Sequence, residues 1–198
     1  FIHSSLIFHT HFFIISLRNT FRLENTEIMK NLVIGQSGGP TAVINASLYG
    51  AVKAFRESGA DGHVLGMING IEGFLADHVM DLSTDLSDKE LELLKLTPAA
   101  YLGSCRYKLP ENLSDPVYPE LFQKFTEKEI SYFFYIGGND SMDTVSKLSR
   151  YAATVGSDIR IIGVPKTIDN DLVLTDHTPG YGSAAKYVAS TVREIAID

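Results

Sequence analysis

A dense polar group, Lys166-Thr167-Ile168-Asp169-Asn170-Asp171, follows an apolar, β-branched run at residues 159–164 and a single proline. In an open parallel sheet, ligands bind just beyond the carboxyl ends of strands. Lysine supplies a compact positive charge that suits phosphate. The two carboxylates flank Asn170, so they can serve different tasks, for instance holding a metal and accepting a proton. The group therefore indicates a reactive site, and a polar loop that caps the next element is the alternative.

Two glycine-rich loops also separate strand-like from helix-like stretches. The first carries Gly35, Gly38 and Gly39, and the second reads Gly137-Gly138-Asn139-Asp140-Ser141. Glycine lets the backbone approach an anion, and the helix N-terminus that follows directs N–H groups at it. The first loop lacks the closing Gly-Lys-Ser/Thr of a P-loop and the spacing of a dinucleotide fingerprint. Tight helix-on-sheet packing remains the alternative for the first loop, and simple N-capping for the second.

Two shorter turns add to this pattern. Gly103-Ser104-Cys105-Arg106 places a guanidinium at the end of a small-residue turn, and Pro179-Gly-Tyr-Gly182 leads into the last helix-like stretch. An arginine can bind phosphate through two parallel hydrogen bonds. It can equally pair with one of the many acidic residues, and the turn alone leaves both open.

Composition excludes several classes of protein. The chain has 198 residues, enough for one domain of ordinary size, and is 44% hydrophobic and 21% charged. A formal net charge of -7 argues against general nucleic-acid binding, because phosphate backbones select basic surfaces. The single cysteine, Cys105, excludes an intrachain disulfide framework and a cysteine-rich zinc site. A reducing, cytoplasmic setting fits that count.

The first 28 residues differ from the rest. Residues 6–17 form an apolar run interrupted by His9 and His11, too short to cross a bilayer and without the features of a signal peptide. Met29 and Lys30 then stand directly before a strand-like start. We expect residues 1–28 to be upstream sequence or an unstructured extension, and the folded domain to occupy residues 29–198.

From Met29 onward, strand-like and helix-like stretches alternate, as in a parallel sheet with crossover helices. We expect strands at residues 32–34, 63–67, 132–136 and 159–164. A glycine-rich turn opens into a helix within residues 35–55, and Ser87 and Glu90 are placed as a capping box in a helix at 85–96. Further helices are expected at residues 119–129, 141–153 and 182–197.

Four motifs occur in a fixed order: SGG at residues 37–39, LGSCR at 102–106, IGGNDS at 136–141 and PKTIDND at 165–171. Together they resemble the phosphofructokinase family, from about Met29 to the end of the chain. PKTIDND is the most specific of the four. The resemblance implies a doubly wound, Rossmann-like parallel sheet with helices on both faces. It also implies reversible transfer of a phosphoryl group to the 1-hydroxyl of fructose 6-phosphate, a step of glycolysis.

The resemblance also implies roles for residues. Asp169 would be the general base, with Lys166 and Thr167 as further catalytic residues. The sugar phosphate would meet Thr167, Ile168 and Asp169. The phosphoryl donor would contact Gly38, Gly39, Arg106, Gly138 and Asp140. A Mg²⁺ ion would be held by Asn139, Asp140 and Asp171, although many relatives carry aspartate where this chain has Asn139, which binds a metal more weakly.

Two positions indicate the donor. Family members that use ATP usually carry glycine where this chain has Asp140 and Lys166, whereas members that use pyrophosphate resemble this chain at both. A carboxylate at Asp140 adds bulk and negative charge where the α-phosphate of a nucleotide would lie. Lys166 can stabilise the small, highly anionic pyrophosphate. Pyrophosphate is therefore the expected donor, and an ATP-dependent enzyme of the same fold is the alternative.

In this family a second α/β lobe follows and supplies residues that hold the sugar phosphate, whereas this chain ends at Asp198 in helix-like sequence. We expect the chain to be the N-terminal, donor-binding half of a longer cytoplasmic enzyme, inactive by itself and a homo-oligomer at full length. Its expected partners are pyrophosphate and fructose 6-phosphate, without nucleic acid or membrane. A non-catalytic phosphate-binding subunit is the remaining alternative.

Overall fold

The computed structural model describes residues 31–197, so the expectation for residues 1–28 lies outside the described residues. A five-stranded sheet has the order β3-β2-β1-β4-β5, in which β1 (Asn31–Gln36), β2 (Val64–Met67), β4 (Ile130–Gly137) and β5 (Arg160–Pro165) run parallel. All four expected strands are present, within a few residues of the expected bounds. The doubly wound α/β prediction is confirmed.

The edge strand β3 (Val79–Asp81) was not expected, and it pairs antiparallel with β2. A parallel return needs a crossover of a dozen or more residues. The connection at residues 68–78 holds only the short helix α3 (Gly70–Leu75), so the chain turns back beside the strand that it has just left. The sheet is therefore mixed at this edge.

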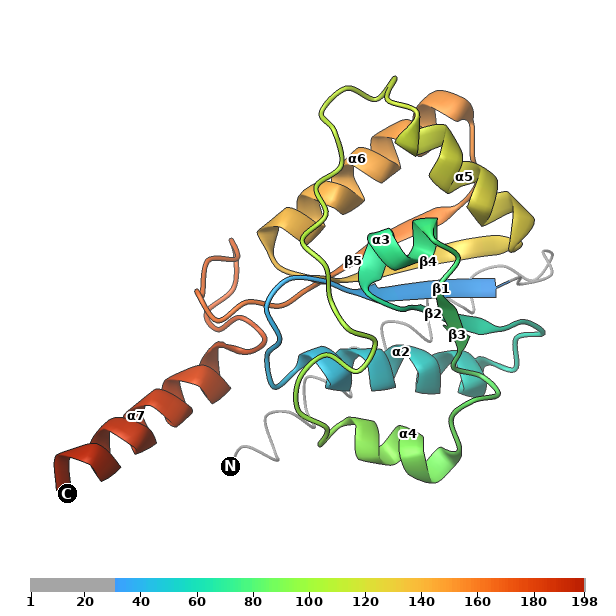
Figure 1. Cartoon of the computed structure of the whole chain (residues 1–198). Helices are drawn as coiled ribbons and strands as arrows, with labels where there is room; N and C mark the ends of the chain where they lie inside the picture. Colours follow the sequence, from blue (N-terminus) through green and yellow to red (C-terminus); the bar gives the residue numbers. More distant parts are fainter. Residues whose placement is uncertain (1–30, 198) are drawn as a thin grey trace.

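Helices cover both faces of the sheet (Figure 1). On one side lie α2 (Ile44–Ser58) and α4 (Asp88–Leu94), and on the other lie α3, α5 (Val117–Glu127) and α6 (Asn139–Val155). Successive strand residues alternate between the two apolar cores, as a pleated strand requires. In β4, for example, Phe134 packs under α2, whereas Phe133 and Tyr135 belong to the other core.

Local residue types account for two helix ends, of which the start of α4 was predicted. Ser87 and Glu90 form the expected capping box at the start of α4: the Ser87 hydroxyl accepts from the Glu90 N–H, and the Glu90 carboxylate accepts from the Ser87 N–H. Helix α2 ends at Gly59, whose positive φ suits a helix C-terminus.

The last helix, α7 (Tyr181–Ile197), extends away from the layered body of the domain (Figure 1). It has no buried residue, and it exposes the large apolar side chains of Tyr187, Val188, Val192, Ile195 and Ile197. Within residues 31–197, no helix is both long and apolar enough to span a membrane.

Candidate active site

The strand order reverses direction at the centre of the sheet, between β1 and β4. From β1 the chain proceeds outward to β2, and from β4 it proceeds to β5 on the opposite side. In doubly wound sheets, ligands bind at the carboxyl ends of the strands that flank such a switch point. The loops after β1, β4 and β5 meet there, and together with residues 105–108 they enclose a cavity of about 500 Å³.

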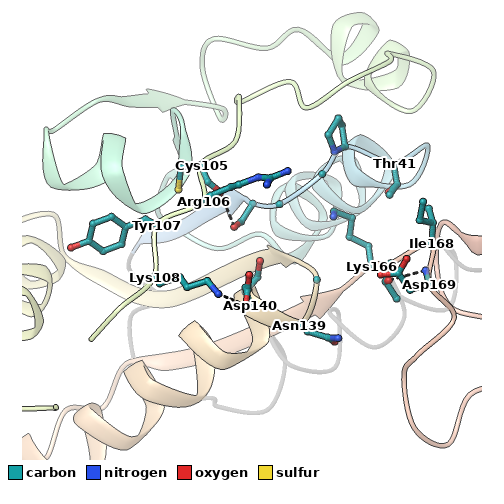
Figure 2. Close-up of a pocket in the computed structure, with 17 residues that line it drawn as sticks. Thr41, Cys105, Arg106, Tyr107, Lys108, Asn139, Asp140, Lys166, Ile168 and Asp169 are labelled. Carbon is teal, nitrogen blue, oxygen red and sulfur yellow. Dashed lines mark hydrogen bonds and ion pairs between the residues drawn. The ribbon is translucent and has the colours of Figure 1, made fainter. Parts of the chain in front are cut away.

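Nearly all the residues expected at the site line this cavity (Figure 2). Gly38 and Gly39 come from the loop after β1, Arg106 from the connection to α5, and Gly138, Asn139 and Asp140 from the start of α6. The loop after β5 contributes Lys166, Thr167, Ile168 and Asp169. Asp171 is the one expected site residue that does not line the cavity.

The loop after β1 is held in place by the LGSCR turn. The Ser104 hydroxyl donates to the Gly38 carbonyl at 2.6 Å, and the Ser37 hydroxyl donates to the Cys105 carbonyl at 3.4 Å. Gly38 has a φ of 72°, a conformation that L side chains rarely adopt. Two motifs far apart in sequence therefore form one wall of the cavity.

Lys166 is buried, with 3% of its surface exposed, and it lines the cavity. Its Nζ lies 3.6 Å from the point that a Cβ atom at Gly38 would occupy. Within residues 31–197 its ammonium makes no hydrogen bond or ion pair. Burial lowers the pKa of Lys166, because desolvation disfavours the charged form. A buried, unpaired cation facing a cavity favours an anionic ligand there.

The PKTIDND loop is fixed by its own polar residues and by the turn before α7. Asn170 has a φ of 55°, its Oδ1 accepts from the Thr178 N–H, and its Nδ2 donates to the Asp176 carbonyl. The Thr178 hydroxyl donates to the Thr167 carbonyl at 2.9 Å. The Asp169 N–H donates to the Thr167 hydroxyl at 3.0 Å, which turns the chain so that Asp169 lines the cavity.

The three expected metal ligands do not gather in one place. Asn139 Nδ2 donates to Asp171 Oδ2 at 2.6 Å, so these two side chains meet across the loops after β4 and β5. Asp140 Oδ1 instead lies 3.1 Å from Lys108 Nζ. No group of three or more His, Cys, Asp or Glu side chains within residues 31–197 is arranged to hold a metal ion.

Several residues at the site were not predicted. Lys108 lines the cavity beside Arg106, and Gln36, fully buried at the end of β1, joins three segments. Its Nε2 donates to Asn45 Oδ1, and its Oε1 accepts from the Leu102 N–H. Thr41 lines the cavity, and its buried hydroxyl oxygen has no hydrogen-bond partner within residues 31–197. Of these residues, only Gln36 had a signal in the sequence, namely a polar side chain at the end of an apolar strand.

Known proteins resemble this chain in sequence and in fold. A protein-family model described as Phosphofructokinase matches residues 31–198. A protein of Halomonas elongata named pyrophosphate--fructose 6-phosphate 1-phosphotransferase is 44% identical over 170 residues, which cover 85% of this chain and 40% of that protein. One of the same name from Xanthomonas campestris pv. campestris is 46% identical over 169 residues, again 85% of this chain and 40% of that protein.

A solved structure, the pyrophosphate-dependent phosphofructokinase from Marinobacter aquaeolei, superposes with a TM-score of 0.77 at 44% identity. The match covers 86% of this chain and 42% of that one. The chain thus spans about 40% of the length of the curated relatives that it matches.

Proposed function

The chain belongs to the phosphofructokinase family, and we propose that it forms the pyrophosphate-binding lobe of an enzyme that phosphorylates fructose 6-phosphate. The observation that carries this proposal is Lys166, a buried ammonium without a protein partner within residues 31–197, facing a cavity whose lining includes the glycines of the loops after β1 and β4. Pyrophosphate is a compact anion that offers this ammonium the partner it lacks.

The proposed reaction needs positioning and charge neutralisation more than covalent help from the protein. Asp169 takes the proton of the sugar 1-hydroxyl as its oxygen bonds to the near phosphorus of pyrophosphate. The bridging P–O bond breaks, and inorganic phosphate leaves with the bond's electrons. Lys166 and Arg106 stabilise the charge that develops on the phosphoryl oxygens. By microscopic reversibility, the same groups would serve the reverse transfer to inorganic phosphate, with Asp169 returning the proton to the sugar oxygen.

Asp140 is proposed to select pyrophosphate over ATP. It stands at the first turn of α6, on the cavity wall opposite the loop that carries Arg106 and Lys108 (Figure 2). A nucleotide must extend beyond its second phosphate, and a carboxylate in that space opposes it by bulk and charge. Pyrophosphate ends before that point.

Mg²⁺ is proposed to enter with pyrophosphate, because magnesium usually combines one or two protein ligands with phosphate oxygens and water. The contact between Asn139 and Asp171 supports this, since it places the Asp171 carboxylate beside the amide side chain of Asn139, a residue that lines the cavity. With Asp140 paired to Lys108, these two are the ligands that we propose. When bound, the ion would neutralise charge on the phosphate oxygens.

A further lobe is proposed to complete the site. The large apolar side chains on α7, with Tyr187 73% and Ile195 71% exposed, form the kind of surface that another segment of protein covers. This agrees with a chain that spans about 40% of its relatives. Residues that hold the far end of the sugar phosphate would come from that lobe. We also propose a cytoplasmic homo-oligomer acting in glycolysis.

The test is a coupled assay of fructose 6-phosphate phosphorylation with pyrophosphate and, separately, ATP, each with Mg²⁺. It is run on this chain alone and on the whole product of its gene. Turnover by the whole product with pyrophosphate only is the expected result. Turnover with ATP only would overturn the donor assignment. The absence of turnover with either donor would favour a non-catalytic phosphate-binding subunit. Robust turnover by this chain alone would contradict the need for a further lobe.

A further inference from the structure

Residues 105–109 run in an irregular segment whose side chains alternate between the buried and the exposed side. Cys105 and Leu109 are buried and Tyr107 is half-buried, whereas Arg106 and Lys108 are exposed. Tyr107 and Leu109 pack on the core formed with α5 and α6. The alternation therefore directs both basic side chains of the segment away from this core, and Arg106 and Lys108 both line the cavity.

Lys108 differs from the other two cations that line the cavity, because it already has a carboxylate partner. Its Nζ lies 3.1 Å from Asp140 Oδ1, and the two side chains are 71% and 76% exposed. No ion pair is formed by Arg106 or Lys166 within residues 31–197. Figure 2 shows the Lys108–Asp140 pair at one end of the cavity and Ile168 and Asp169 at the other.

The same segment is attached to α6 a second time, two turns further along the helix. Lys147, 3% exposed, donates from Nζ to the Leu109 carbonyl at 3.0 Å and pairs with Asp143 at 2.7 Å and with Glu111. Since α6 also carries Asp140, this buried anchor fixes the distance that Lys108 must span. The exposed pair is thus built into the arrangement of loop and helix.

We infer that Lys108 is a positioning residue for Asp140: it holds the carboxylate at the cavity wall and neutralises it, so that an anion can bind beside a residue that excludes nucleotides. The inference rests on the proposed function. Without Lys108, Asp140 would face a pyrophosphate ion as an uncompensated like charge, which weakens binding. Because both side chains are largely exposed, we expect an effect of about two- to fivefold, the range of exposed ion pairs.

The test measures the Kd of pyrophosphate with Mg²⁺ for the 198-residue chain by titration calorimetry. The proteins compared are the parent, Lys108→Ala, Asp140→Asn and the double variant. We expect Lys108→Ala to raise the Kd about two- to fivefold in the parent and to leave it unchanged in the Asp140→Asn background. Lys108→Arg, which keeps the charge, should restore the parent value. The increase in Kd caused by Lys108→Ala should shrink near 1 M salt, where the screening length is only about 3 Å.

A matched control removes an ion pair elsewhere. Lys95 Nζ lies 2.6 Å from Glu92 Oε2, and neither residue lines the cavity. Lys95→Ala should therefore leave the pyrophosphate Kd unchanged. If Lys108→Ala weakens binding equally in the Asp140→Asn background, Lys108 contacts pyrophosphate itself and the inference is wrong. An unchanged Kd for Lys108→Ala in the parent overturns it as well. If the parent binds no pyrophosphate, the proposed function fails and the inference falls with it.

Discussion

The ammonium nitrogen of Lys166 lies 3.6 Å from the point where a Cβ atom at Gly38 would stand. Gly38 belongs to the loop after β1 and Lys166 to the loop after β5, on opposite sides of β4 in the sheet. The missing side chain at Gly38 leaves space beside the cation, and the positive φ of Gly38 maintains the loop that shapes it. The space for an anion at this cation therefore depends on the glycine.

Gly38→Ala should lose both stability and pyrophosphate affinity. The left-handed backbone costs an alanine about 1–2 kcal/mol, and the new methyl group enters the space beside Lys166 Nζ. Gly59→Ala is the matched control, because Gly59 has nearly the same φ, 71°, and nothing within 4 Å of its Cβ position. We expect both variants to lose a similar amount in Tm. Only Gly38→Ala should also raise the Kd of pyrophosphate. Equal affinities in the two variants would contradict this account.

The Lys166→Met variant should bind pyrophosphate far more weakly than the parent does. Without ligand, the variant should nevertheless be more stable than the parent. The apolar stem is kept while the buried charge is removed, and such replacements often stabilise by about 1 kcal/mol or more. For a chain of this size, about 1 kcal/mol corresponds to about 2–4 °C in Tm. Thermal unfolding and calorimetry measure the two effects. A destabilised variant would show that Lys166 has an unrecognised partner.

The pH dependence of the parent gives an independent measurement of the same charge. Burial lowers the pKa of Lys166, so above that pKa the folded chain binds fewer protons than the unfolded chain. Below the lowered pKa, the buried charge reduces the free energy of unfolding by its full amount. This reduction disappears as pH rises from the lowered pKa toward the ordinary lysine value. Relative to Lys166→Met, the parent should therefore gain stability across that window, and its pyrophosphate affinity should fall.

Lys147→Met should lower Tm and weaken pyrophosphate binding together, because Lys147 ties the Leu109 carbonyl to α6. Hydrogen bonds with Asp143 and then Glu111 raise the pKa of Lys147 to about 12. The contribution of Lys147 to stability is therefore complete below the ordinary lysine pKa and is lost only as pH rises through about 12. The loss of Tm in Lys147→Met should accordingly be the same at about pH 7 and about pH 9. Lys89→Met, an exposed lysine without an ion pair within residues 31–197, is the control. An unaltered Kd would show that the anchor does not position the cavity wall.

Asn139→Asp should create a stronger metal site at the cost of stability without metal. Asn139 Nδ2 donates to Asp171 Oδ2 at 2.6 Å, so the substitution places two carboxylates in contact. We expect the variant to lose about 1 kcal/mol in EDTA, in line with exposed charge pairs, and to recover it in Mg²⁺. Asp140→Asn, which lies outside this contact, serves as the control. If Mg²⁺ does not raise the Tm of Asn139→Asp, the proposed ligands are wrong.

Local sequence patterns determined most elements of the fold. Alternating apolar runs and glycine-rich turns predicted four parallel strands, and the capping box at Ser87 and Glu90 marked the start of α4. These signals act between near neighbours, where spacing and geometry are directly related. The edge strand β3 and helix α3 were missed, because three partly buried residues carry no distinctive pattern and their pairing with β2 is non-local.

The sequence by itself predicted residues that line the cavity. Glycine loops after apolar strands and the PKTIDND group placed Lys166, Asp140 and Asp169 together, because strand ends in a doubly wound sheet converge. Only the tertiary structure decided which charges meet. It separated Asp140 from Asp171, joined Asp140 to Lys108 and left Lys166 buried without a partner within residues 31–197. Charge pairing depends on side-chain positions from segments far apart in the chain, and no local pattern encodes those distances.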